Sequence, residues 1–266
     1  MYSELPKKIY KYRSWKSDFD KELIKENVLF LTSPKYFNDP FDCRIPDNIY
    51  SLNTDEKIKE YVELSINKLI HSTLEESSIR KKKFYDEIKN DLDKFHNKLE
   101  NIVFDRQNEY SGVISLSAVW NNILMWSHYA DNHRGYCVGL IEEKIRNNKK
   151  VGMFGLVNYD NNDDYPFINP LEQNITQKSV NRIQNKARNW KYEEEYRISK
   201  LFYPNSPSDE DRKLRFENDC YTEITLGINI SKEDKEEIID IGKRKNIKIY
   251  QATKIPLKFK ITRVEI

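Results

Sequence analysis

A short run of charged and aromatic residues, Trp190 to Ile198, alternates with the period of a β-strand. Side chains of a strand point to its two faces in turn, so Glu193, Glu195 and Arg197 are expected on one face. Two carboxylates at positions i and i+2 lie roughly 6–7 Å apart, which lets both ionise while each disturbs the titration of the other. Such a pair is suited to breaking a glycosidic bond. The alternative is a solvated strand face with an internal Glu–Arg ion pair.

Composition narrows the classes of protein to which the chain can belong. Its 266 residues are enough for one domain over residues 1–266 with a sizeable insertion. Forty-five Lys and Arg residues nearly balance 43 Asp and Glu residues, so no overall basic field points to a nucleic-acid partner. Apolar runs are too short for a membrane helix, the first nine residues do not resemble a signal peptide, and Cys43, Cys137 and Cys220 are widely spaced. We therefore expect a cytoplasmic protein with reduced thiols, no membrane contact and no metal.

Secondary-structure patterns predict a mixed or antiparallel sheet with helices around it. Ser17 is the expected N-cap of a helix that runs through Glu26, and Ser231 caps a later helix. Further helices are predicted at residues 122–130 and 173–189. Strands are predicted at residues 8–13, 28–32, 113–118, 136–141, 151–159, 190–198, 221–226, 247–251 and 259–264. Between the second and third strands, residues 34–41 form an expected rigid loop that three aromatic side chains anchor.

Residues 54–108 interrupt this pattern with apolar residues at helical spacing. One series extends from Ile58 to Leu69 and Ile70, and a second follows Ser77 and Ser78. We expect two long helices that pack as a hairpin inserted into the α+β domain, with the basic run at residues 80–83 as a solvated cap at their junction. The hairpin offers a surface for a protein partner.

Four segments resemble, in order, the motifs of a bacterial domain-of-unknown-function family, number 2971. They are residues 9–13 (IYKYR), 31–42 (LTSPKYFNDPFD), 124–135 (LMWSHYADNHRG) and 192–197 (YEEEYR). The resemblance spans nearly the whole chain. It implies a relationship, because the family itself has no established activity.

A second resemblance implies chemistry. ADP-ribosyltransferases of the arginine–serine–glutamate type carry an Arg on the first strand, a Ser-x-Ser on a middle strand and a Glu-x-Glu near the C-terminus. Arg13, Ser115 with Ser117, and Glu193 with Glu195 are similar in order and placement. By this resemblance, NAD is the substrate: Arg13 holds its phosphates, the serines orient Arg13 or the glutamate, Glu195 stabilises the ribosyl cation, and Glu193 orients the acceptor.

Four further residues are assigned to this site by the same resemblance or by their chemistry. Ser33 is a rival for the serine role, and Arg197 pairs with Glu195 if the two share a face. Asn38 and Asp39 form either a turn or a loop that contacts the adenine or ribose.

His128 supports a different function. It follows Met125 and Trp126 on a predicted helix, and it can act as a proton carrier if Asp131 or Asp39 orients it. A histidine with carboxylates and no metal pattern is compatible with a metal-independent nuclease.

Our expectation is thus an NAD-dependent ADP-ribosyltransferase or NAD glycohydrolase, with an unidentified macromolecular acceptor. The roles in which such families are usually found suggest a bacterial toxin or an antiphage defence effector. The alternatives are the His128 nuclease and a non-enzymatic sensor or interaction module.

Overall fold

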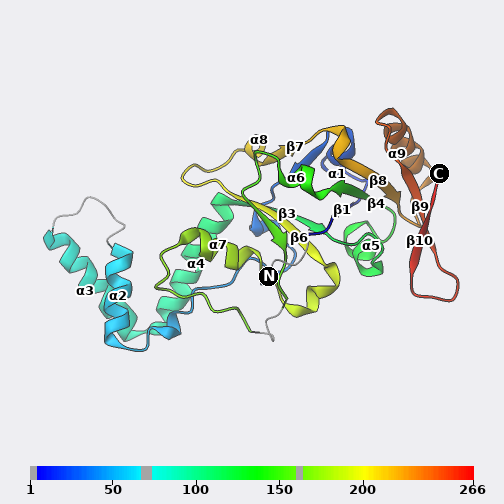
Figure 1. Ribbon diagram of the computed structural model, residues 1–266. Coiled ribbons are helices and arrows are strands. Elements are labelled where there is room, and N and C mark those ends of the chain that lie inside the picture. Colours follow the sequence, from blue (N-terminus) through cyan, green and yellow to red (C-terminus); the bar gives the residue numbers. More distant parts are fainter. Residues whose placement is uncertain (1–4, 67–73, 160–163) are drawn as a thin grey trace.

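The computed structural model describes residues 5–66, 74–159 and 164–266, and its centre is an eight-stranded mixed sheet (Figure 1). The strand order is β10-β9-β8-β4-β1-β3-β6-β5, and every neighbouring pair is antiparallel except β8 with β9. The strands are β1 (Lys8–Arg13), β3 (Ser111–Ser117), β4 (Tyr136–Ile141), β5 (Met153–Leu156), β6 (Glu195–Leu201), β8 (Tyr221–Leu226), β9 (Ile249–Lys254) and β10 (Ile261–Glu265). A separate two-stranded sheet pairs β2 (Val28–Phe30) with β7 (Lys213–Arg215). The predicted α+β class is confirmed.

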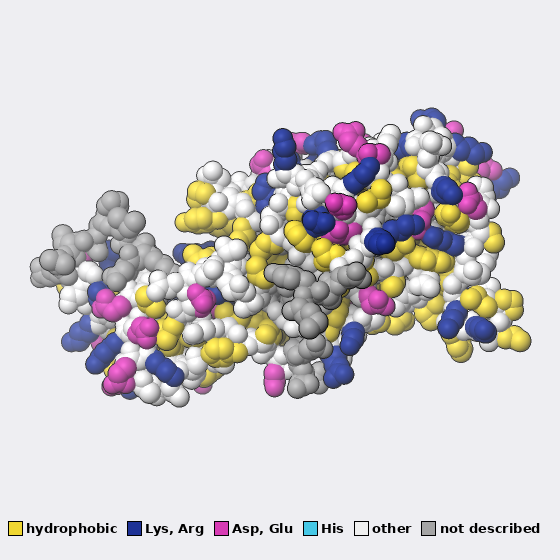
Figure 2. All heavy atoms as spheres, in the orientation of Figure 1, with side chains coloured by type: hydrophobic (Ala, Val, Ile, Leu, Met, Phe, Trp, Pro, Cys, Tyr) yellow, Lys and Arg dark blue, Asp and Glu magenta, His cyan; other side chains and the backbone are white. Residues whose placement is uncertain are grey.

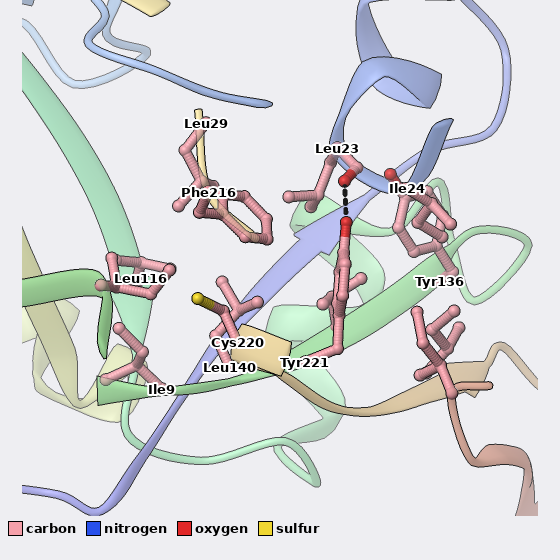
Figure 3. Close-up of a cluster of buried hydrophobic side chains, with 14 of the residues drawn as sticks. Ile9, Leu23, Ile24, Leu29, Leu116, Tyr136, Leu140, Phe216, Cys220 and Tyr221 are labelled. Atoms are coloured by element: carbon pink, nitrogen blue, oxygen red, sulfur yellow. Dashed lines mark hydrogen bonds between the residues drawn. The ribbon is translucent and has the colours of Figure 1, made fainter. Parts of the chain in front are cut away.

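Side chains of each strand point to the two faces of the sheet in turn, and both faces carry apolar side chains. Helices therefore cover both faces. On one face, helices α1 (Asp18–Lys25), α6 (Glu142–Arg146) and α9 (Lys232–Arg244) close the main hydrophobic core. Figure 3 shows this core, in which the Tyr221 hydroxyl donates to the carbonyl of Leu23 in α1. On the other face, α5 (Ile123–Tyr129) packs Met125 and Trp126 against Tyr12 of β1.

Helix caps lie where the sequence predicts them. The Ser17 side chain accepts from Asp20 N at the start of α1, and Ser231 accepts from Asp234 N at the start of α9. Strands β1, β4 and β8 also have their predicted bounds. No helix in the described ranges is both long and apolar enough to cross a membrane.

The described residues between 55 and 110, which are 55–66 and 74–110, form three helices instead of the two that the sequence predicts. They are α2 (Asp55–Ile66), α3 (Leu74–Asn90) and α4 (Leu92–Tyr110). Asp91 caps α4 by accepting from Lys94 N, and this cap breaks the second predicted helix. The basic run at residues 80–83 therefore lies within α3, while predicted helical positions 69 and 70 fall outside the described residues. Figure 1 shows α2 and α3 projecting from the body while α4 leads back to β3.

Three other expectations need correction. The predicted helix over residues 173–189 is shorter, α7 (Ile175–Ile183), and a 3-10 helix at Arg188–Glu193 precedes β6. The predicted strand at residues 151–159 is only the four-residue β5. In the loop at residues 34–41, Phe37 is partly buried, but Tyr36 and Phe41 are exposed, so one of the three aromatic side chains and not all three can anchor the loop. Short helices that the sequence did not predict are η1 (Pro34–Tyr36), η2 (Ile49–Ser51), α6, α8 (Asp209–Arg212) and η4 (Asn218–Cys220).

A seam opens in the sheet between β1 and β3. These strands share one register pair, Tyr10 with Ser117, and then separate. Further along β3, Thr32 takes the place of β1 by bridging to Val113. Between these two contacts the Lys11 amine donates to the Ser115 carbonyl at 2.6 Å. A side chain thus supplies the hydrogen bond that a paired strand would make, and space remains beside it.

Candidate functional site

A cavity of about 570 Å³ opens at this seam, within the size range of small-molecule sites. Its walls come from β1, β3, the loop after Thr32, α5 and the segment that leads into β6. Elements far apart in the chain therefore meet here. Of the predicted site residues, seven line the cavity: Arg13, Asn38, Ser115, Ser117, His128, Glu193 and Glu195.

Glu193 and Glu195 reach the cavity by different routes. Glu195 is the first residue of β6, but Glu193 is the last residue of the preceding 3-10 helix, so the prediction of one continuous strand was wrong. Glu194, between them, has a left-handed backbone with φ of 42° and is exposed. This turn brings both neighbouring carboxylates to the same side, where they are almost completely buried.

Ser117 holds that turn in place. Its hydroxyl donates to the Glu193 carbonyl at 2.7 Å and accepts from Val119 N at 3.1 Å. The backbone bond from Ala118 N to Glu194 O, at 2.8 Å, adds a second tie between β3 and the turn. Ser117 is therefore a positioning residue for Glu193.

Glu195 is locked in a buried ion pair with Arg197. The Arg197 guanidinium donates from Nε to Glu195 Oε1 at 2.7 Å and from Nη2 to Oε2 at 2.9 Å. Nη2 also donates to Asp42 Oδ2 at 2.6 Å. Both carboxylates and the guanidinium are almost inaccessible to solvent, so the alternative of a solvated strand face is excluded. The other oxygen of Asp42, Oδ1, has no hydrogen-bond partner among the described residues.

Lys186 joins this pair to Glu193. Its amine lies 2.5 Å from Glu193 Oε2, 3.2 Å from Glu195 Oε2 and 3.4 Å from Asp42 Oδ2. The Tyr129 hydroxyl, from α5, donates to Glu193 Oε1 at 2.6 Å. Three carboxylates thus share two cations, Lys186 and Arg197, at one end of the cavity.

The two glutamates titrate in opposite directions. Burial alone would raise the pKa of Glu195, but the charges of Arg197 and Lys186 and a hydrogen bond from Ser115 lower it to about 2. Burial raises the pKa of Glu193, and the neighbouring charge of Glu195 adds to this although Lys186 opposes it. Neighbouring carboxyl groups whose pKa values are driven apart are typical of acid–base sites.

Cations from β1 and the loop after it line the other part of the cavity. Arg13 Nη1 lies 4.0 Å from Asp20 Oδ1, and Lys16 pairs with Asp131 at 2.7 Å. Burial, and then the charge of Arg13, lower the pKa of Lys11 to about 7, although Glu195 and Glu193 act in the opposite direction. These cations make the β1 side able to attract an anion.

Three predicted site residues do not line the cavity. The buried Ser33 donates to Asn108 O at 2.6 Å and so ties a loop to α4. Asp39 Oδ1 accepts from Phe41 N at 2.9 Å, which is the turn-forming role. Arg197 lies behind Glu195 and acts on the cavity through it.

His128 lies at the cavity wall and is exposed, near the rings of Tyr129 and Tyr192. Neither of its expected orienting partners is arranged for that role, since Asp131 pairs with Lys16 and Asp39 closes its own turn. Within the described ranges, no carboxylate lies within ion-pair distance of His128, and no cluster of His, Cys, Asp and Glu could hold a metal ion.

Sequence reasoning missed four residues of the site, namely Lys11, Asp42, Tyr129 and Lys186. Asp42 and Tyr129 lie in the family motifs quoted above, and their carboxyl and hydroxyl groups could have marked them as site residues. Lys11 alternates with Arg13 on the same strand. Lys186 carried no signal, because one lysine after a helix is usually a solvated residue.

Comparison with known proteins is consistent with the relationship that the motifs indicate. No curated protein and no solved structure matches the chain significantly. A family model does match, over a segment that contains most of α5, Lys186, both glutamates and Arg197. Residues 125–198 match the family described as "Protein of unknown function (DUF2971)", in support of the family assignment predicted from the motifs.

Proposed function

We propose that the cavity binds NAD and breaks the glycosidic bond to nicotinamide, transferring the ADP-ribosyl group to water or to a macromolecule. One observation carries this proposal: a single cavity is lined by Arg13 and Lys16, from β1 and the loop after it, and by the buried carboxylate cluster of Glu193, Glu195 and Asp42. NAD matches this distribution, because its pyrophosphate is anionic and its nicotinamide riboside is cationic. A ligand with charge of one sign only would match half of the cavity.

At the β1 side, Arg13 is suited to the pyrophosphate. Its guanidinium can form two parallel hydrogen bonds to phosphate oxygens, which an ammonium group cannot. Its present interactions with Asp20, at 4.0 Å, and with the Phe19 ring, at 5.0 Å, are weak enough to be exchanged for a ligand. Lys16 adds positive charge nearby, and Lys11, whose pKa is lowered to about 7, adds a partial charge at neutral pH.

At the opposite side, Glu193, Glu195 and Asp42 face the two cations Lys186 and Arg197. With all five groups ionised, one negative charge remains. That charge is buried, where electrostatic interactions are stronger than in water. It stabilises the positive charge that develops on the ribose as the glycosidic bond breaks.

Within this proposal, the free acceptor positions favour Glu193 over Glu195 as the group that contacts the ribose. A carboxylate offers about four acceptor positions. Those of Glu195 are taken by two Arg197 nitrogens, Lys186 and Ser115. Glu193 accepts from Tyr129 and Lys186 and keeps acceptor capacity. We therefore assign ribose-hydroxyl binding to Glu193 and a fixed electrostatic role to Glu195.

The chemistry balances without a further reactant when water is the acceptor. The carbon–nitrogen bond between ribose and nicotinamide breaks, and its electron pair leaves with neutral nicotinamide. Water then attacks the ribosyl carbon and loses a proton. The raised pKa of Glu193 suits it to receive that proton. A macromolecular acceptor would replace the water.

Calorimetric titration tests the binding half of the proposal. NAD should bind the wild-type protein, whereas ATP, which lacks the cationic end, and a short RNA should bind at least tenfold more weakly. Arg13→Ala should weaken NAD binding at least tenfold. Arg146→Ala is a matched control, because Arg146 and Arg13 have side-chain exposures of 27% and 22% and each lies over a phenylalanine ring. If NAD does not bind, or the two variants behave alike, the proposal fails.

Nicotinamide release tests the reaction. Glu193→Gln keeps an oxygen that can accept from the ribose hydroxyl but removes the negative charge, so it should change NAD affinity little and lower turnover by about 10²–10³-fold. His128→Ala should leave turnover within a few-fold of wild type. Loss of nicotinamide release in the His128 variant, with an unchanged melting temperature, would contradict the assignment of the chemistry to Glu193. Cleavage of RNA that depends on His128, without nicotinamide release by the wild type, would favour the nuclease alternative.

A cytoplasmic location remains part of this proposal, as does the role of a toxin or a defence effector. Cys43, Cys137 and Cys220 are all free and buried, which is compatible with a reducing compartment. NAD consumption without a regulating partner would harm the host cell.

A further inference from the structure

The hairpin of β9 and β10 ends in a protruding tip, residues 254–260, at the edge of the molecule opposite the arm of α2 and α3 (Figure 1). Leu257 and Phe259 at this tip have relative exposures of 106% and 97%. They are the two most exposed large apolar side chains of the described residues. Figure 2 shows apolar and basic side chains gathered there.

Neither packing nor backbone preference explains the leucine. Leu257 has a left-handed backbone with φ of 59°, a conformation that glycine or asparagine adopts at lower cost. The turn is closed by hydrogen bonds from Ile255 N to Lys260 O at 3.0 Å and from Lys258 N to Ile255 O at 3.2 Å. A strained apolar residue in open solvent indicates a role outside the folded chain.

All the charged residues of the tip are basic. Lys254, Lys258 and Lys260 are exposed around the two apolar side chains. No acidic residue occurs from Ile249 to Val264, although the whole chain carries a net charge of only +2. The tip is therefore a local concentration of positive charge beside exposed apolar surface.

The base of the hairpin is held firmly. Ala252 of β9 and Ile261 of β10 are buried against the α5 side of the sheet. Arg263 lies between the rings of Trp120 and Tyr250, at 4.2 and 4.4 Å from their centroids. The tip is thus presented on a fixed support.

We propose that this tip docks on the surface of an anionic lipid bilayer. Leu257 and Phe259 enter the boundary between headgroups and acyl chains, and the three lysines bind anionic headgroups. This mode of contact needs no spanning helix, so it differs from the expectation of no membrane contact, which rested on the shortness of the apolar runs. A protruding tip that ends in Leu257 can insert into a deformable bilayer surface. Single-stranded nucleic acid is instead bound in a groove by aromatic side chains on which the bases stack. Acidic lipid headgroups supply the negative charges that pair with these lysines.

Vesicle co-sedimentation of the full chain tests this inference independently of NAD. The protein should bind phosphatidylglycerol vesicles at low salt, bind phosphatidylcholine vesicles at least tenfold more weakly, and dissociate as salt rises. Leu257→Gly and Phe259→Ser should each weaken binding about tenfold or more, because each removes a large apolar group.

Two features keep the test decisive. Leu257→Gly removes the backbone strain, so its melting temperature should equal or exceed that of wild type. Tyr203→Ser is the control, since Tyr203 is an exposed aromatic residue far from the hairpin along the sheet and its loss should not change binding. Absence of binding to anionic vesicles, or equal binding by the tip variants, overturns the proposal. Tip-dependent binding of a short RNA or of an acidic protein, without vesicle binding, overturns it as well.

Discussion

Replacing Glu195 by glutamine should destabilise the protein by about 3 kcal/mol at pH 7. The difference between the ordinary pKa of 4.5 and about 2 in the folded protein, at 1.36 kcal/mol per pH unit, gives this figure. Removal of one partner from a buried ion pair typically costs about 3–5 kcal/mol, which agrees with it. The variant leaves the Arg197 charge buried with Asp42 as its remaining close carboxylate.

The stability that Glu195→Gln loses should become smaller as the pH falls. A carboxyl group whose pKa is lower in the folded protein stabilises the fold above its unfolded-state pKa, and this contribution is lost as the pH falls toward the folded-state value. For Glu195 the window extends from about pH 4.5 down to about pH 2. The difference between wild type and Glu195→Gln should therefore shrink to about 1 kcal/mol at pH 3.

Urea denaturation at pH 7 and pH 3 measures both differences. Glu210→Gln is the matched control, because Glu210 also pairs with an arginine, Arg215, but both side chains are more than half exposed. Solvent screening should make its effect at pH 7 small. If the two variants lose the same stability, or if the loss for Glu195 does not change with pH, the buried pair does not stabilise this fold.

Two further predictions concern contacts around the cavity, and a third concerns the tight turn at Gly227. Reductive methylation of Lys11, followed by mass spectrometry, should be half-maximal near pH 7; a midpoint close to that of free lysine, about 10.4, would contradict the buried environment. Ser117→Ala should lower the free energy of unfolding by about 1–3 kcal/mol, because it leaves the buried Glu193 carbonyl without its partner; an unchanged urea midpoint would refute its positioning role. Gly227→Ala should cost at least about 2 kcal/mol, because the new Cβ would lie 2.2 Å from His133 O; a melting temperature equal to that of wild type would show that this turn yields easily.

The parts of the fold that the sequence predicted well are governed by local interactions. Strands β1, β4 and β8 follow from alternating or continuous apolar residues, and Ser17 and Ser231 are caps whose hydrogen bonds lie within one turn. The break at Asp91 was not predictable in the same way, because the apolar period continues across it.

The site was predictable in its residue types and less so in its geometry. The alternation of residues 190–198 correctly placed Glu195 and Arg197 on one face, but nothing in the sequence signals the left-handed turn at Glu194. Lys186 approaches both glutamates only because the chain folds back between α7 and β6. Such contacts depend on tertiary packing, which local periodicity does not encode.

A crystal structure of the protein with NAD or a non-hydrolysable NAD analogue tests the central proposal most directly. We predict the pyrophosphate within hydrogen-bond distance of Arg13, and the nicotinamide ribose beside Glu193 and Tyr129, with the Glu195–Arg197 pair intact. NAD bound outside the cavity, or bound with its nicotinamide end beside Arg13, would contradict the assignment of charges on which the proposed function rests.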